Sequence, residues 1–112
     1  MARITTIVHF EVPAENVDQF FAFWQDHIED NVSKQPGLID GIFHRGIDPD
    51  GPFQFINVAH WDSSEQLASG LQATSRELPV GRVFEDLGVK VSQNNYVEAV
   101  RYTAKPGPSN AE

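Results

Sequence analysis

In the N-terminal part of the chain, the spacing of apolar residues changes from every second position to every third or fourth position. Over residues 3–12, apolar side chains alternate with polar ones, which is the period of a half-buried β-strand. From residue 15 onward apolar side chains recur every three or four positions, which predicts one apolar face on a helix of about five turns. That face comprises Val17, Phe20, Phe21, Trp24, Ile28 and Val32, and the solvated face is predicted to carry Asp18, Gln25, Glu29 and Asp30.

Gln-Pro-Gly at residues 35–37 predicts the end of this helix. Residues 38–45 and 53–62 then alternate again, and both are predicted to be strands. The segment between them, 46–52, contains two glycines and two prolines, which is typical of a hairpin loop.

A second helix is predicted to begin after Ser63. Ser63 is followed three residues later by Gln66, and this spacing forms a capping box at a helix N-terminus. Leu67 and Leu71 would then face inward. Because Pro79 and Gly81 interrupt the pattern, we expect a broken helix or two short ones.

The C-terminal part is predicted to hold one more strand. Ser-Gln-Asn-Asn at 92–95 is typical of a turn, and residues 96–103 (YVEAVRYT) favour a strand. We therefore expect one domain over 1–104. Residues 105–112 carry two prolines and no large apolar side chain, and we expect a disordered tail.

The element order β-α-β-β-α-β is that of the ferredoxin-like α+β fold. This fold has a four-stranded antiparallel sheet with both helices on one face. If Asn57 and Trp61 face the helices, then Ile56, Val58 and His60 lie on the face without helices. An apolar sheet face left open to water is unfavourable. We therefore expect a homodimer in which two such faces stack, a dimeric α+β barrel.

Composition narrows the function classes. The 112 residues are 40% hydrophobic and 11% aromatic, which fits one folded domain rather than a disordered chain. A net charge of −8 disfavours contact with phosphate backbones, so no nucleic-acid partner is expected. No apolar run reaches the length of a membrane span, so no membrane association is expected. The absence of cysteine excludes disulfides and thiolate ligands, and it fits a cytoplasmic protein.

The four histidines suggest no metal site. They are scattered over the first helix and the first three strands, without a carboxylate or cysteine at a helpful spacing. We therefore expect no metal.

Residues 53–67, FQFINVAHWDSSEQL, carry a family resemblance. An aromatic-rich strand that ends in Trp, followed by a small polar cap and a helix, resembles the antibiotic biosynthesis monooxygenase family of dimeric α+β barrels. The Gln-Pro-Gly turn at 35–37 is a second shared feature, and the resemblance spans roughly residues 3–103. Members of this family include cofactor-free oxygenases that form quinones, quinol oxygenases and heme-degrading enzymes.

The quinone-forming members have the same Asn-x-x-x-Trp spacing as Asn57 and Trp61. The resemblance implies that these two residues, with Arg82 as a weaker candidate, are catalytic. It also implies an enzyme without cofactor that oxidises an aromatic phenol, anthrone or quinol to a quinone with molecular oxygen. The substrate pocket is expected to be walled by the aromatic residues Phe21, Trp24, Phe43, Phe53, Phe55, Phe84 and Tyr102.

The residue types suit this chemistry. An electron-rich phenolate can pass an electron to oxygen directly, and the protein then has to bind the substrate, help remove a proton and stabilise an oxyanion. The Asn57 amide can donate to that oxyanion, and Trp61 offers a flat ring with one N–H donor. Both residues lie on one strand face, about 13 Å apart. The sequence does not identify the proton acceptor, for which water and the imidazole of His27 are options.

Two other readings stay open. Asn57 and Trp61 can equally be a satisfied structural amide and a core residue in a non-catalytic dimeric barrel that binds a small hydrophobic ligand. An isomerase or lyase on the same fold is a third reading. Heme degradation is disfavoured because no histidine follows His60. The second helix also lacks the tyrosine that some quinone-forming members carry there.

Overall fold

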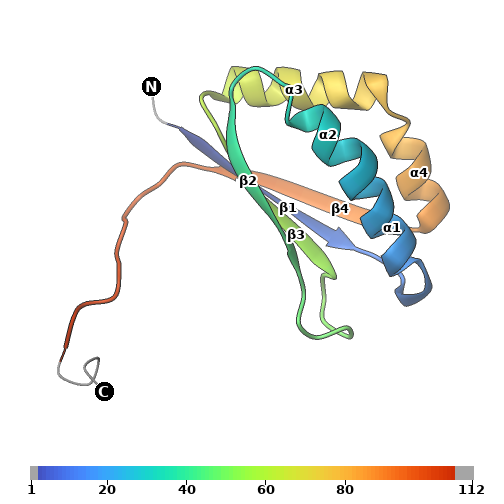
Figure 1. The fold of residues 1–112 in the computed structure, drawn as a ribbon, viewed down its shortest axis with the longest axis horizontal. Helices are drawn as coiled ribbons and strands as arrows, with labels where there is room; N and C mark the ends of the chain where they lie inside the picture. Colours follow the sequence, from blue (N-terminus) through green and yellow to red (C-terminus); the bar gives the residue numbers. More distant parts are fainter. Residues whose placement is uncertain (1–2, 108–112) are drawn as a thin grey trace.

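The computed structural model describes residues 3–107 as a four-stranded sheet with its helices packed on one face (Figure 1). The strands lie in the order β2-β3-β1-β4, and all neighbours are antiparallel. This confirms the predicted ferredoxin-like α+β fold. The elements are β1 (Ile4–Glu11), a 3-10 turn (Ala14–Asn16), α1 (Val17–Phe23), a π-helical turn (Trp24–Ile28), α2 (Glu29–Val32), β2 (Leu38–Arg45), β3 (Phe55–Trp61), α3 (Ser64–Glu77), α4 (Val80–Leu87) and β4 (Lys90–Tyr96).

The first helix is one rod with a change of winding in its middle. α1, the π-helical turn and α2 follow each other without a break over residues 17–32. In the π turn the N–H of Glu29 donates to the carbonyl of Trp24, five residues back instead of four. A π turn accommodates one extra residue and so rotates everything after it around the helix axis.

The second helical region is divided as the sequence predicts. The Ser63 side chain accepts a hydrogen bond from the N–H of Gln66 (3.1 Å) and donates to its side-chain oxygen (3.3 Å), which confirms the capping interaction. α3 ends at Glu77, and α4 begins at Val80 after Pro79. A proline ring cannot continue a helix through its interior, and the chain turns here.

The last strand lies earlier in the chain than predicted. β4 covers Lys90–Tyr96, so the predicted turn at 92–95 is inside the strand and the predicted strand at 96–103 is wrong. The side chains of Gln93 and Asn95 are held by a β1 hydroxyl: Thr6 Oγ1 donates to Asn95 Oδ1 (2.8 Å) and accepts from Gln93 Nε2 (3.0 Å). Hydrogen bonds of this kind from the neighbouring strand allow turn-forming residues to lie in an edge strand.

Residues 97–107 leave the sheet as an extended segment that points away from the helices (Figure 1). Val100 and Tyr102 in this segment are 77% and 89% exposed. Arg101 donates to the carboxylate of Glu98 (2.8 and 3.0 Å), and this lowers the pKa of Glu98. The predicted domain 1–104 and tail 105–112 stay predictions, because most of the tail lies outside the described residues.

The two sheet faces differ as the period-two pattern predicts. Phe55, Ala59 and Trp61 of β3 are buried under the helices. On the opposite face, Val58 lies between Ile7 of β1 and Ile42 of β2 in the sheet register. We call this row, together with Ile56, the open face. Ile42 is 63% exposed there, so the open face is apolar and uncovered in the single chain.

Candidate functional site

A hollow of about 320 Å³ lies between the sheet and the helices, and it contains both of the principal residues predicted from the sequence. Asn57 and Trp61 of β3 line it together with side chains from β1, β2, the first helix and α3. The size is at the lower end of the range for small-molecule pockets. The lining residues are Thr6, Val8, Trp24, Glu29, Val32, Ser33, Leu38, Gly41, Asn57, Ala59, Trp61 and Leu71.

Asn57 lies at the centre of the sheet floor. Its neighbours in the register are Val8 of β1 and Phe43 of β2, neither of which has a polar side chain. Within residues 3–107 the Asn57 amide makes no side-chain hydrogen bond. A half-buried amide without a protein partner is available to a ligand in the hollow.

Trp61 closes one end of the hollow. The residue is 1% exposed and packs with Ala59 and Leu67. A methyl group at Gly70 of α3 would lie 2.6 Å from Cη2 of the indole, so the missing side chain at this position lets the helix backbone approach the ring. The tryptophan is therefore held tightly.

The indole N–H of Trp61 has no acceptor. In the part of the chain that the structure describes, Nε1 of Trp61 is the one fully buried side-chain polar atom without a hydrogen-bond partner. Leaving a buried donor unsatisfied costs about 1–3 kcal/mol. Such a cost is common at functional sites, where the partner is a ligand or a water. Two unpartnered donor groups, Trp61 and Asn57, thus belong to one hollow.

The first helix contributes the opposite wall, through Trp24, Glu29, Val32 and Ser33. Trp24 is buried and stacks on Phe43, with ring centroids 3.8 Å apart. Of the seven aromatic residues predicted to wall the pocket, Trp24 is the one that lines this hollow.

Glu29 is exposed, as the sequence predicts, and it also lies at the rim of the hollow. The π turn explains this place at the rim. The extra residue between 24 and 28 rotates the following positions, so Glu29 and Ser33 take the angular places that a regular helix would give to Ile28 and Val32. The Ser33 hydroxyl donates to Oε2 of Glu29 (2.9 Å).

Most of the other predicted wall residues lie in the core away from this hollow. Phe55 is buried and stacks with Phe21 and Phe43, and Phe84 packs edge-on against Phe10. Phe53 contacts the ring of His9, and Tyr102 lies in the exposed segment after β4. Their roles in substrate binding stay predictions, and the structure does not bring them to the hollow.

Arg82 and His27 also lie outside the hollow. Arg82 is exposed on α4, and His27 lies against Phe23 of its own helix with ring centroids 5.3 Å apart. A catalytic role for Arg82 stays a prediction from the resemblance.

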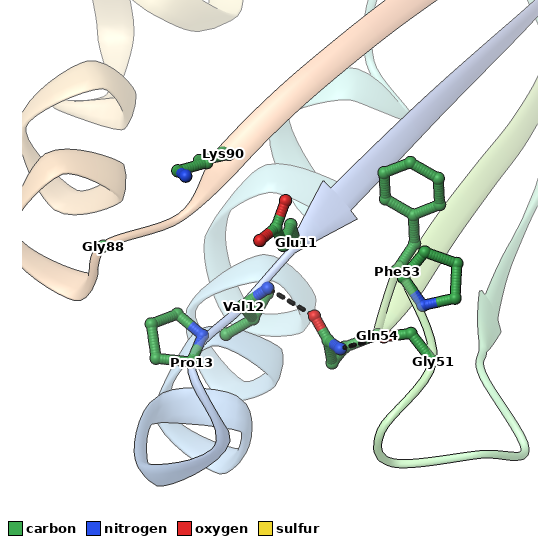
Figure 2. Close-up of a pocket in the computed structure, with 9 residues that line it drawn as sticks. Glu11, Val12, Pro13, Gly51, Phe53, Gln54, Gly88 and Lys90 are labelled. Carbon is green, nitrogen blue, oxygen red and sulfur yellow. Dashed lines mark hydrogen bonds between the residues drawn. The ribbon is translucent and has the colours of Figure 1, made fainter.

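A larger hollow, about 560 Å³, lies at the far end of the sheet between the end of β1, the 51–54 segment and the start of β4 (Figure 2). Gln54 braces it: its Oε1 accepts from the N–H of Val12 (2.6 Å) and its Nε2 donates to the carbonyl of Gly51 (3.0 Å). These two hydrogen bonds connect the hairpin to β1, and they use both the oxygen and the nitrogen of the Gln54 amide. We therefore place the site at the smaller hollow, where the N–H donors of Asn57 and Trp61 have no partner.

Within residues 3–107, no three or more His, Asp or Glu side chains gather as a metal-binding group. Over the same residues, no helix has the length and apolarity to cross a bilayer.

Comparisons with solved structures show the same fold. A candidate monooxygenase from Shewanella loihica PV-4 is 27% identical, with 90% of this chain and 97% of that chain covered and a TM-score of 0.68. SnoaB, a cofactor-independent oxygenase from Streptomyces nogalater, is 19% identical, with 92% and 97% covered and a TM-score of 0.63. HapK from Hahella chejuensis is 15% identical, with 92% and 99% covered and a TM-score of 0.67. No curated protein matches the sequence.

The sequence pattern that defines the family "Antibiotic biosynthesis monooxygenase" matches residues 3–74. This span contains β1 to β3 and most of α3, and with them every residue that lines the hollow; Arg82 lies beyond it. Family membership supports a monooxygenase-type role. The resemblance seen at residues 53–67 is confirmed, and the chain belongs to the antibiotic biosynthesis monooxygenase family.

Proposed function

We propose that this protein is a cofactor-independent monooxygenase that oxidises an aromatic phenol, anthrone or quinol to a quinone. The observation that carries the proposal is the pair of unpartnered donors, the Asn57 amide and the buried Trp61 N–H, in one hollow with largely apolar walls. Family membership and the fold shared with a cofactor-independent oxygenase support it.

The donors suit an anionic substrate. Removal of a proton from a phenol or anthrone leaves negative charge on oxygen, and N–H donors in a site of low polarity stabilise that charge. The electron-rich anion can then reduce molecular oxygen. For an anthrone, the carbon that bears two hydrogens becomes a carbonyl: one oxygen atom enters the product, the other leaves as water, and the substrate supplies all four electrons.

The hollow also suits the planar shape of such substrates. The rings of Trp24 and Trp61 line its walls. Gly41 and Ala59 line it from the sheet, and their small size leaves room above the strands. Aromatic rings prefer stacked or edge-on contacts with other rings, so a flat substrate gains contact energy between these walls.

The test is oxygen consumption by the purified protein with a panel of anthrones and hydroquinones. We expect Asn57→Ala to lower kcat by about 10²–10³-fold while the unfolding temperature changes little, because one oxyanion donor is lost. Trp61→Phe is the companion variant, which keeps a ring and removes the N–H. If Asn57→Ala folds and oxidises the panel as fast as the parent, Asn57 is a structural amide and the proposed site is wrong.

A binding protein without catalytic activity is the second candidate, and the apolar lining of the hollow is the observation that favours it. The same panel separates the two functions. A ligand that binds to the parent protein and is never oxidised would favour the binding function, and Asn57→Ala would then change affinity alone.

Assembly as a homodimer is part of this proposal. The open face presents Ile7, Val58 and Ile42 in one row, and a second copy stacked on it would remove this apolar surface from water. A stable interface buries more than about 1,000 Å². We expect light scattering at micromolar concentration to give twice the 12.5 kDa of one chain, and a monomer would contradict the stacked arrangement.

A further inference from the structure

We propose that Glu29 is the proton acceptor of this site, a catalytic base that takes the proton from the bound phenol or anthrone. The inference rests on the proposed function and names the group that the sequence analysis did not find. It is carried by the position of Glu29 at the rim of the hollow and by the chemistry of the other lining residues.

Glu29 is the one residue with a carboxylate among those that line the hollow, all of which belong to the described part of the chain. A carboxylate can accept a proton from a substrate. The others are apolar, hydroxyl or amide side chains and an indole that serves as a donor. The elements that form the other walls of the hollow, namely β1, β2, β3 and α3, contribute no charged side chain to it.

The histidines do not compete for this role. His60 pairs with Asp40 (Nδ1 to Oδ1, 2.5 Å) on the open face, and His27 packs on Phe23 along the outer side of the first helix. Neither lines the hollow. On the same helix, Asp30 is paired with Lys34 and also lies outside it.

The carboxylate of Glu29 is also held in one orientation. The Ser33 hydroxyl, one turn further along, donates to Oε2 of Glu29 and leaves Oε1 without a partner among the described residues. One oxygen is thus held and the other can accept a proton. A base must lie within hydrogen-bond reach of the proton that it removes. A side chain fixed by a hydrogen bond keeps this position for a larger share of the time than one that rotates freely.

The backbone of the first helix also favours this role for Glu29. The π turn at Trp24–Ile28 is the feature that rotates Glu29 and Ser33 toward the hollow together. Single π turns inside α-helices occur frequently at functional sites. Here the irregular turn places an acceptor on the helix wall opposite the donors of Asn57 and Trp61 on the sheet.

The proton transfer balances within the site. The substrate O–H or C–H bond breaks, an O–H bond forms on Glu29, and the electron pair stays on the substrate, where the donors stabilise it. Because the mouth of the hollow is open at Glu29, which is an exposed residue, the carboxylic acid can return its proton to water before the next turnover.

The test compares Glu29→Gln with Asp30→Asn, a matched change from carboxylate to amide at the next residue of the helix. We expect Glu29→Gln to lower kcat/KM by about 10²–10⁴-fold, the usual contribution of a general base. We expect Asp30→Asn to stay within twofold of the parent. In both variants the unfolding temperature is measured, since a folding defect would lower activity for another reason.

The pH profile separates a base from a merely structural side chain. In the parent protein, kcat/KM should fall at acidic pH, because a protonated carboxylic acid cannot accept a second proton. Glu29→Gln should lack this acidic limb, and its rate should rise with pH as more substrate ionises in solution. Added formate or acetate should restore part of the activity of Glu29→Ala.

Each outcome decides one of the two proposals. If Asn57→Ala loses activity while Glu29→Gln keeps the rate and the pH profile of the parent, Glu29 is not the base and the oxygenase function stands. If the parent consumes no oxygen with any member of the panel, the proposed function falls and the role of Glu29 falls with it.

Discussion

The layer between the sheet and the helices has two ends that are packed in different ways. At one end, Phe10, Phe20 and Phe55 meet at ring centroid distances of 5.2 and 5.6 Å and are at most 4% exposed. At the other end, Ala59, Trp61 and Leu67 form a smaller cluster next to the hollow. We call these the aromatic end and the Trp61 end. The same two layers enclose both.

The difference follows from side-chain size. At the aromatic end large rings from both layers fill the space, and tight packing of this kind stabilises the fold. At the Trp61 end the Trp61 ring fills the space beside Gly70, whereas the small residues Gly41 and Ala59 line the hollow. In this small domain, the packing at the aromatic end stabilises the fold, and the space at the Trp61 end is available to a ligand.

The largest expected effect is a loss of unfolding free energy when a ring at the aromatic end is removed. Phe20 is fully buried among Phe10, Phe55 and Phe84. Phe20→Ala should lower the free energy of unfolding by about 3–5 kcal/mol, because it leaves a cavity in a packed core. Chemical denaturation measures this loss, and oxygen consumption well below the unfolding temperature should remain near that of the parent.

Phe53→Ala is the control for this variant. Phe53 is 38% exposed and lies against His9, so its truncation should cost far less than that of Phe20. If the two variants lose the same free energy of unfolding, the aromatic end does not carry the stability that its packing indicates.

A smaller effect is expected at the Trp61 end. Gly70→Ala places a methyl group 2.6 Å from the Trp61 ring, so the ring or α3 has to move. We expect a loss of about 1–3 kcal/mol from overpacking, together with reduced oxidation because the indole N–H is displaced. Denaturation and oxygen consumption measure the two losses on one preparation.

Gly81→Ala is the matched control for Gly70→Ala. Nothing lies within 4 Å of a methyl group at Gly81, which is also helical. This variant should gain about 0.4–1 kcal/mol, because alanine restricts the unfolded chain more than glycine does. Equal behaviour of the two variants would mean that the contact between Gly70 and Trp61 does not constrain the site.

The fold and part of the site could be predicted because they depend on periodicity. A period of two places Asn57 and Trp61 on the same face of one strand, and the change to a helical period marks which face is covered. The capping serine and Pro79 set the limits of α3 through local chemistry. None of these inferences needs a long-range contact.

The errors have the opposite origin. The sequence predicts the last strand too late because Gln93 and Asn95 favour turns locally. In the sheet both side chains form hydrogen bonds with Thr6, almost ninety positions earlier in the chain. Glu29 is exposed as predicted, but its place at the rim of the hollow does not follow from a regular period of 3.6, because the π turn adds one residue to that period. The free N–H of Trp61 depends on what surrounds it in three dimensions and has no counterpart in the sequence.

Trp24 and Trp61 are the two tryptophans of the whole chain, and both line the same hollow. Intrinsic fluorescence excited where tryptophan alone absorbs therefore originates entirely from the walls of this site. One indole is stacked on Phe43 and the other has a free N–H, so the two report different parts of the hollow. A bound quinone, which accepts excitation energy and electrons from indole, would quench both. The protein thus has a built-in optical reporter of occupancy that requires no label and no turnover.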